Sequence, residues 1–262
     1  MKWMRYSHRG TVGFGVLDGE RVQPHDGDLF DRPVPAGEAI DVHQVTWLPP
    51  CRPTKIVGLW NNYRAAAEKN GWSVPPEPLY FLKSPGSATG HGQAIAVPSS
   101  YDGRVVYEGE LAVVIGRRAK DVAVADAAAF IFGYACANDV TALELLHRDP
   151  SFPQWTRAKS FDGFAAFGPV IETDFDPSTA VLRTMVGGRE RQNYALSDMF
   201  FGPAELVSHL SRDMTLEAGD VIFCGTSLGV LPMKPGTTVD VEVDGIGTLS
   251  NVYGGVAPVT AD

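Results

Sequence analysis

The sequence has few cysteines, and they form no recognisable pair. Its 262 residues include only Cys51, Cys136 and Cys224, which lie far apart and form no Cys-x-x-Cys motif. An odd number of separated cysteines predicts free thiols, as expected for a protein of a reducing compartment, most simply the cytoplasm. A chain of this length buries roughly three quarters of its unfolded surface, so it needs no disulfide or structural metal for stability.

The sequence also lacks long apolar runs and clusters of positive charge. No apolar run of about 18 residues occurs, and the first ten residues contain no apolar core of a signal peptide. We therefore expect a cytoplasmic protein without a membrane segment. The formal net charge of −9 argues against nucleic acid as a partner.

The first fifty residues differ in character from the rest of the chain. The apolar stretch 11–17 is followed by Asp18-Gly19, which is a hairpin turn signal, and a proline-rich stretch then extends to Pro53. We predict a small N-terminal β segment over residues 1–53 and a catalytic domain over residues 54–262.

The rest of the chain predicts strands with a few short helices between them. Strands are expected over 55–59, 105–115 and 221–224, with a hairpin around Asp244-Gly245 where valines alternate with acidic residues. Helices are expected over 62–70, closed by Gly71, and over 125–134 and 203–212. Because helices and strands do not alternate regularly, the pattern disfavours Rossmann and TIM architectures. It favours a mainly β sandwich or roll with decorating helices (α+β).

Two carboxylates lie two residues apart in the predicted strand 105–115. Residues i and i+2 of a strand point to the same face, so Glu108 and Glu110 are expected to share one space. A solvated face would explain the pair, but Ala112 and Val114 continue that face with apolar side chains. Two like charges away from water are costly unless a cation or a proton intervenes. Carboxylate oxygens suit Mg²⁺, Mn²⁺ or Ca²⁺ better than zinc.

Two further residues have ordinary explanations when each is taken alone. Asp139 would cap a short helix over 141–147, and Lys159 would be an exposed loop lysine.

Taken together, four segments in a fixed order give these residues another meaning. The segments are Tyr107-Glu108-Gly109-Glu110-Leu111, Asn138-Asp139-Val140-Thr141-Ala142, Lys159-Ser160-Phe161-Asp162, and Gly219-Asp220-Val221-Ile222 leading into Gly225-Thr226. As a set they resemble the fumarylacetoacetate hydrolase family over nearly all of residues 55–254. The first fifty residues resemble the small N-terminal β segment of many bacterial members.

The resemblance implies a fold, a metal and a class of substrate. It implies the family's mixed β-sandwich roll, a homodimer, and an enolisable 2-oxo acid or 1,3-dicarbonyl as substrate. Glu108, Glu110 and Asp139 match the family's ligands of Mg²⁺ or Mn²⁺, with Ca²⁺ as a substitute in crystals. Lys159 matches the active-site lysine, and Thr226 matches a threonine that contacts substrate.

The chain departs from the family pattern where a base is expected. Hydrolytic and decarboxylating relatives typically have Asn-Tyr-x-x-His with an acid three residues later, on a mobile helix. Here Ala66 stands at the histidine position and Lys69 at the acid position. Glu68 is the candidate replacement base, although it would point about 100° around the helix. Tyr63 of the same segment is a candidate substrate contact.

A second departure concerns the substrate's tail. Relatives often have an arginine and a glutamine after the metal-binding aspartate, where this chain has Leu143 and Leu146. We expect a more apolar pocket that lacks one carboxylate clamp and that binds an apolar or aromatic tail. Alternatively, Arg148 or Arg157 replaces the missing positive charge.

The sequence therefore predicts a metal-dependent enzyme that acts through an enolate. Isomerisation, decarboxylation or C–C cleavage would each fit. One alternative is an acylpyruvate hydrolase with a replacement base, and another is a metal-binding or regulatory protein that has lost catalysis.

Two other motifs give weaker signals. Residues 225–229 match Gly-x-Ser-x-Gly, but no histidine follows Ser227, so the order of an α/β-hydrolase triad cannot be met. Residues 84–90 are rich in small residues but lack the Gly-Lys-Ser/Thr ending of a phosphate loop. Lys83, next to that loop, is a candidate anion contact.

Overall fold

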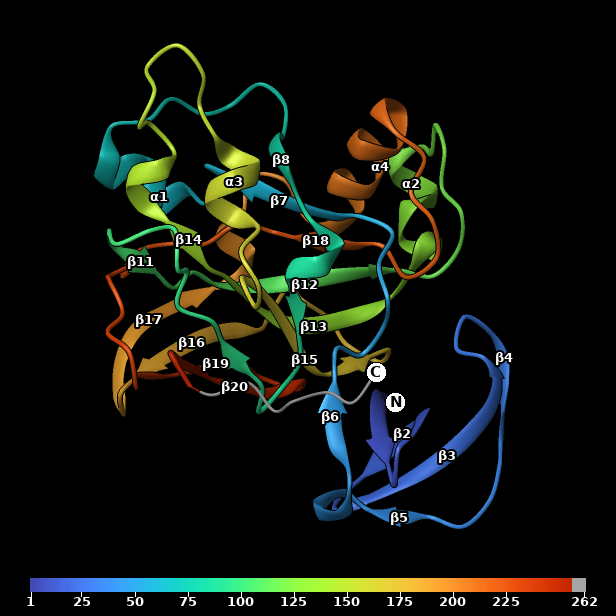
Figure 1. The fold of residues 1–262 in the computed structure, drawn as a ribbon. Coiled ribbons are helices and arrows are strands. Elements are labelled where there is room, and N and C mark those ends of the chain that lie inside the picture. The colour runs from blue at the N-terminus through green and yellow to red at the C-terminus, as the bar shows by residue number, and fades with distance from the viewer. Residues whose placement is uncertain (256–262) are drawn as a thin grey trace.

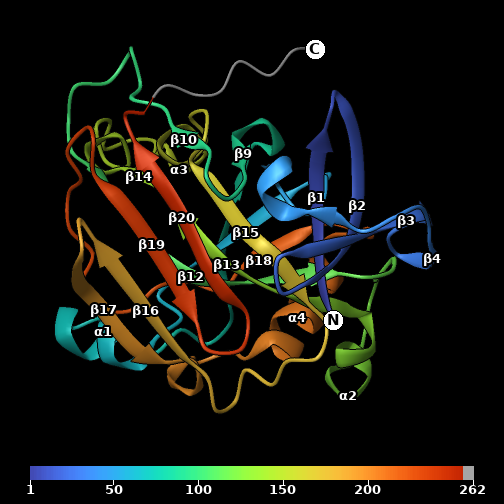
Figure 2. The same cartoon turned by 90° about the horizontal axis from the view of Figure 1, so that it is seen from below.

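The fold is mainly β, with a few short helices at its edges. A computed structural model describes residues 1–255. It contains a large curled sheet, a second sheet that packs beneath it, and a two-stranded ribbon (Figures 1 and 2). The predicted mainly β architecture with decorating helices is confirmed. Within the described part of the chain, no helix has the length and apolar character needed to cross a membrane.

The main sheet joins the N-terminal segment to the rest of the chain. In sheet order its strands are β4 (Asp31–Pro35), β3 (Arg21–Asp28), β2 (Thr11–Asp18), β1 (Lys2–His8), β15 (Ala165–Glu172), β13 (Ile131–Asp139), β12 (Gly109–Ile115), β18 (Val221–Phe223), β7 (Ile56–Trp60) and β8 (Leu79–Lys83), with β5 (Ile40–Asp41), β6 (Thr46–Leu48) and β9 (Ala88–Thr89) pairing beside them. The hairpin expected at Asp18-Gly19 joins β2 to β3. Because β1 pairs with β15, the two parts share one sheet, and the division near residue 54 stays a prediction.

The second sheet and the two-stranded ribbon complete the β structure. The second sheet contains β10 (Ala94–Ile95), β20 (Gly247–Tyr253), β19 (Thr238–Val243), β16 (Val181–Val186) and β17 (Arg189–Ala195), and the ribbon pairs β11 (Val105–Val106) with β14 (Thr141–Ala142). The predicted hairpin at Asp244-Gly245 joins β19 to β20.

The helices lie at two ends of the main sheet. The α-helices are α1 (Arg64–Asn70), α2 (Val124–Ala127), α3 (Trp155–Lys159) and α4 (Pro203–Asp213), and the 3₁₀ turns are η1 (Val42–Gln44), η2 (Pro85–Ser87), η3 (Ala128–Phe130), η4 (Leu143–Leu145) and η5 (Leu196–Asp198). Helices α1 and α3 lie near each other at one end, whereas α2 and α4 lie together at the other (Figure 1). As predicted, α1 ends at Gly71, whose left-handed backbone (φ 68°) closes the helix.

Strand β12 lies in the core, and both of its faces are buried. Leu111, Val113 and Ile115 belong to the larger apolar cluster, which also includes residues of the second sheet. Ala112 and Val114 belong to a smaller cluster on the other face. A carboxylate at the start of this strand is therefore held away from bulk water.

Three predicted elements are wrong, each for a physical reason. The alanine-rich stretch 125–134 is helical only to Phe130, because the residues from Ile131 onward form β13 between β12 and β15. The strand 105–115 is broken after Val106, since β11 leaves the main sheet to pair with β14. The helix expected over 141–147 is replaced by β14 and the turn η4, so Asp139 ends a strand and caps no helix.

Candidate metal centre and active-site cavity

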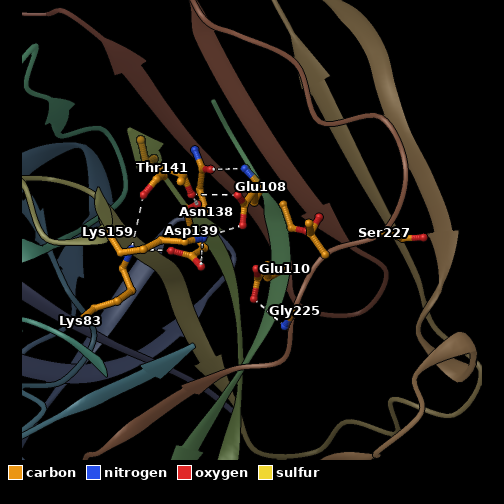
Figure 3. A network of polar contacts seen from close by, with 12 residues as sticks. Lys83, Glu108, Glu110, Asn138, Asp139, Thr141, Lys159, Gly225 and Ser227 are labelled. Atoms are coloured by element: carbon orange, nitrogen blue, oxygen red, sulfur yellow. Dashed lines mark hydrogen bonds and ion pairs between the residues drawn. The ribbon is translucent and has the colours of Figure 1, made fainter. Parts of the chain in front are cut away.

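Three carboxylates meet where the neighbouring strands β12 and β13 of the main sheet begin and end. Glu110 lies in β12, Asp139 is the last residue of β13, and Glu108 lies in the break between β11 and β12. One oxygen of each carboxylate lies within 4.8 Å of the others. The structure thus brings together the three residues that the sequence predicts as metal ligands (Figure 3).

Backbone and amide contacts fix this arrangement. The Glu108 amide donates a hydrogen bond to Asn138 Oδ1 (3.0 Å), and the Asp139 amide donates to the Glu108 carbonyl (2.9 Å). The Thr141 hydroxyl donates to Glu108 Oε1 (2.8 Å). These bonds turn the Glu108 side chain toward the other two carboxylates, although Glu108 is outside a regular strand.

The glycine between the two glutamates is required by the second sheet. A Cβ at Gly109 would lie 2.1 Å from Thr184 Oγ1 and 3.0 Å from Gln192 Oε1. The Gly109 amide also donates to Gln192 Oε1 (2.9 Å). The Glu-Gly-Glu pattern therefore reflects a close approach of β16 and β17 to β12 as well as the paired charges.

Two buried lysines partly balance the carboxylates. Lys159, at the end of α3, donates to Glu108 Oε2 (2.8 Å) and Asp139 Oδ2 (2.6 Å). Lys83, at the end of β8, forms a buried ion pair with Asp139 Oδ1. Three carboxylates against two ammonium groups leave a formal excess of one negative charge when all five are ionised.

The protonation of the cluster reflects this competition between burial and pairing. Burial would lower the pKa of Lys159, but Asp139 and Glu108 outweigh it and raise the pKa well above its ordinary value. Burial lowers the pKa of Lys83, and its pairing with Asp139 offsets this only in part. Burial, followed by the charges of Asp139 and Glu108, raises the pKa of Glu110 well above its ordinary value.

The donor set fits a hard divalent cation. Glu110 Oε2 accepts a hydrogen bond from the Gly225 amide (2.7 Å), where Gly225 adopts a left-handed backbone (φ 88°). Glu110 Oε1 is buried and has no hydrogen-bond partner among the described residues. A buried carboxylate oxygen without a donor is costly, and an all-oxygen cation site would satisfy it.

A cavity of about 640 Å³ opens beside this cluster. Glu108, Lys159 and Thr226 contribute to its polar side. Its apolar side is formed by aromatic and aliphatic residues, which include Trp60, Trp72, Phe81, Leu143, Leu146, Trp155, Leu228 and Val230. The size and this mixture are typical of a small-molecule site.

The aromatic rings form a connected wall. The rings of Trp60 and Trp72 lie 4.9 Å apart, and those of Phe81 and Trp155 are stacked at 5.1 Å. Lys159 Nζ lies 4.8 Å from the centre of the Phe81 ring, so the wall reaches the lysine. Sequence reasoning missed the tryptophans because they come from β7, α3 and the loop after α1, and no local motif links them.

Three of the five predicted substrate contacts line the cavity, and two do not. Leu143, Leu146 and Thr226 line the cavity, whereas Lys83 is buried behind Asp139 and does not. Tyr63 is also absent from the lining, and its buried ring packs edge-on against Tyr194 at 4.9 Å.

The structure does not bring Glu68 into the cavity. It lies on the exposed side of α1 and is not among the residues that line the cavity. Ala66, Lys69 and Asn70 of the same helix do line it. The helix therefore presents to the cavity the very position at which the family's histidine is missing.

The hydroxyl of Thr226 is already engaged. It donates to the Gly109 carbonyl (2.8 Å) and accepts from Gln192 Nε2 (2.8 Å). Gln192 thus joins Thr226 to the glutamate loop, a link between distant segments that sequence reasoning missed. The nearby Ser227 points away from the carboxylates (Figure 3), and its buried hydroxyl has no partner among the described residues, which agrees with rejection of a serine nucleophile.

Asp220 of the fourth motif segment supports the fold. It accepts hydrogen bonds from the backbone amides of Thr54 (3.0 Å), Lys55 (2.9 Å) and Glu217 (2.7 Å). Because β7 and β18 begin just after these residues, Asp220 holds the starts of two paired strands together.

Comparison with known proteins finds matches along nearly the whole chain. A family model described as fumarylacetoacetate (FAA) hydrolase C-terminal matches residues 55–253, and one described as Rv2993c-like, N-terminal matches residues 1–50. The oxaloacetate tautomerase YisK of Bacillus subtilis is 38% identical over 216 residues, which cover 78% of this chain and 71% of that protein.

Two solved structures of isomerases are similar over almost their full length. A 5-carboxymethyl-2-hydroxymuconate delta-isomerase from Mycobacterium smegmatis is 38% identical, with a TM-score of 0.89 and coverage of 97% of this chain and 99% of that one. A 2-hydroxyhepta-2,4-diene-1,7-dioate isomerase from Mycobacterium marinum is 35% identical, with a TM-score of 0.88 and coverage of 97% and 98%.

Proposed function

Because the chain belongs to the fumarylacetoacetate hydrolase family, whose model matches residues 55–253, we propose that it is a divalent-metal-dependent isomerase of an enolisable 2-oxo acid with an apolar or aromatic tail. The observation that carries the proposal is that the 640 Å³ cavity has charged side chains on one side and apolar side chains on the other. Glu108 and Lys159 lie among its lining residues, and aromatic rings form much of its wall.

The metal proposed for the site is Mg²⁺ or Mn²⁺, held by Glu108, Glu110 and Asp139. When bound, such a cation polarises the oxygens of a chelating 2-oxo acid, and so makes the neighbouring C–H bond more acidic. Glu110 Oε1, which lacks another partner, supports its role as a ligand.

Lys159 supplies a fixed positive charge at the cavity. Its ion pairs with Glu108 and Asp139 hold the ammonium in place, and its raised pKa keeps it charged throughout the neutral range. A cation held in a water-poor site stabilises the oxygen that becomes negative in an enolate. Thr226 offers the substrate an oxygen lone pair or its methyl group, since its proton is donated to Gly109.

Isomerisation is favoured over hydrolysis by the composition of the cavity. Hydrolysis of a C–C bond needs a bound water beside its base, but the walls of this cavity are largely aromatic and aliphatic, and Ala66 presents only a methyl group at the position where relatives typically have the histidine. Proton transfer within the substrate needs no water. The similar proteins described as a tautomerase and as isomerases support the same choice.

The tail is proposed to be apolar because of Leu143 and Leu146. Both line the cavity, so neither can form a charge-assisted hydrogen bond with a second carboxylate. Arg148 does not line the cavity, and its guanidinium lies 5.7 Å from the centre of the Tyr101 ring. Arg157 is likewise absent from the lining.

A substrate panel tests the proposal. Acylpyruvates, oxaloacetate and 2-hydroxydienoates, with aryl and long-acyl members, would be incubated with Mg²⁺, with Mn²⁺ and with EDTA, and the products identified by mass spectrometry. Glu110→Ala serves as the blank. We expect metal-dependent isomerisation that favours apolar members. Metal binding without turnover of any member would instead support a non-catalytic role, and cleavage with uptake of water would support a hydrolase.

We also propose a homodimer, which analytical ultracentrifugation would test.

A further inference from the structure

The cavity contains an imidazole that no motif points to. His147 directly follows Leu146, and it lines the same cavity as Glu108, Lys159 and Ala66. Among the cavity-lining residues within 1–255, it is the one histidine. In the sequence His147 looks like any other single histidine, and only the chain path after β14 brings it to the cavity.

The other groups near the cavity are poorly suited to take a proton from carbon. Lys159 keeps its proton because two carboxylates raise its pKa. The Thr226 hydroxyl is bonded to Gly109 and Gln192. Burial raises the pKa of Glu108, but both of its oxygens accept hydrogen bonds, from Thr141 and Lys159, and the carboxylate is a proposed metal ligand, so it is not free to take a proton. Imidazole, in contrast, is the side chain that ordinarily exchanges a proton near neutral pH.

The backbone that precedes His147 is well anchored. Leu145 is fully buried in the core, and the Leu146 carbonyl accepts a hydrogen bond from the Gln154 amide (3.2 Å). Glu144 pairs with Arg104 and accepts a hydrogen bond from Tyr101 on the outer side of the turn. The anchored turn therefore fixes the backbone position of His147. Because the His147 side chain is exposed, its ring can exchange protons with water.

The charged groups around the cavity define the setting of the imidazole. Lys69 from α1 lines the cavity together with Glu108 and Lys159. The charged residues that follow His147 in the chain make other contacts. Arg148 lies over the Tyr101 ring, and Asp149 accepts hydrogen bonds from the amide and hydroxyl of Ser151.

We infer that His147 is the catalytic residue that moves the proton during isomerisation, in the place of the histidine that is missing at Ala66. This inference rests on the proposed function. The imidazole nitrogen takes a proton from the carbon next to the ketone, and the C–H electron pair forms the new C=C bond while the carbonyl pair moves to oxygen. The imidazolium then returns the proton to the oxygen or to the far carbon, so the substrate changes its bonding but not its formula.

Substitution of His147 tests this role in kinetics. General acid–base groups typically contribute about 10²–10⁴-fold to a rate, so His147→Gln should lower kcat at least about 100-fold and change KM little. The acid limb of the pH profile of kcat should disappear, and added imidazole should partly restore His147→Ala. His209→Gln is the matched control, because His209 lies at a different hollow with Glu77 and Arg212. Wild-type kcat in His147→Gln would overturn the inference.

A binding measurement keeps the inference separate from the proposed function. Histidine-selective NMR would follow the ring signals during titration with Mg²⁺ and oxalate, a small mimic of an enolised 2-oxo acid, with assignment by their loss in His147→Gln. We expect the His147 signals to shift on oxalate binding and those of His209 to stay. If oxalate binds and the His147 signals do not move, His147 does not face the ligand and the assignment fails. Absence of turnover in the wild type would overturn the proposed function itself, whereas turnover retained by His147→Gln would overturn only the role of His147.

Discussion

Replacement of Glu110 by glutamine distinguishes the effect of this residue on metal binding from its effect on the stability of the metal-free protein. A glutamine has nearly the same shape and its amide oxygen can still accept the hydrogen bond from Gly225. Above the raised pKa of Glu110, the change removes one negative charge from a fully buried position. We therefore expect the metal-free variant to be at least as stable as the metal-free wild type, because a buried charge has been removed without a cavity or a lost bond.

The metal should have opposite consequences in the two proteins. At a free metal concentration of about 100 times Kd, binding to the folded state adds about 2.7 kcal/mol. For a domain of this size that is a rise in Tm of roughly 5–10 °C. If Glu110→Gln weakens binding about 100-fold, the same concentration adds only about 0.4 kcal/mol and raises Tm by roughly 1 °C.

The assay is thermal unfolding after exhaustive EDTA treatment, followed by titration with Mn²⁺ and with Mg²⁺. Wild-type Kd comes first from calorimetric titration. Glu77→Gln is the control, since Glu77 is exposed and lies apart from the carboxylate cluster. A metal-induced rise in Tm that is as large in Glu110→Gln as in the wild type would refute Glu110 as a ligand. A large loss of metal-free stability would refute the idea that the buried charge is costly.

Three further predictions concern the proposed charges and walls of the site. Replacing Leu143 by arginine should raise kcat/KM for substrates with a second carboxylate, relative to apolar substrates, at least about tenfold. The reason is that a charge-assisted hydrogen bond contributes about 1.5–3 kcal/mol. An unchanged ratio of the two kcat/KM values would contradict the proposed tail subsite. Replacing Lys159 by methionine should destabilise the metal-free protein by about 3 kcal/mol in denaturant titrations, since the carboxylates lose a buried partner. The same change should abolish turnover. An unchanged unfolding midpoint would contradict the expected loss of stability. Burial raises the pKa of Glu110 above the usual 4.5, so the folded state binds more protons than the unfolded state. The contribution of this carboxyl to metal-free stability is therefore largest at low pH and is lost as pH rises through the raised pKa. Wild-type Tm, compared with that of Glu110→Gln, should fall as the pH rises from the ordinary carboxyl value of 4.5 through the raised pKa. A parallel course in both proteins would show that this carboxyl does not titrate as expected.

Local signals predicted the elements whose structure depends on nearby residues. Gly71 ends α1, Pro203 begins α4, and Asp18-Gly19 forms the turn between β2 and β3. In each case a backbone preference of one or two residues decides the outcome. The stretch 125–134 failed for the opposite reason, because pairing of β13 with strands on both sides overrides the helical preference of its alanines.

The acidic part of the site was predictable as a pattern, but its partners were not. Glu108, Glu110 and Asp139 could be named from their segments in the sequence. The pairing of Lys83 with Asp139 spans 56 residues and depends on where β8 ends relative to β13. The contacts of Gln192 with Gly109 and Thr226, and the position of His147, likewise require the packed fold. No spacing in the sequence encodes such contacts.

The most direct test of the central claim is proton exchange in an aryl-tailed 2-oxo acid. The CH₂ signal of phenylpyruvate would be followed by NMR in D₂O with the wild-type protein and Mg²⁺, with EDTA, and with Glu110→Ala. We predict that the signal disappears much faster with the wild type and Mg²⁺ than in the other two samples, because enolisation exchanges that proton with solvent. Equal rates in all three would contradict a metal-dependent site that enolises an apolar-tailed 2-oxo acid.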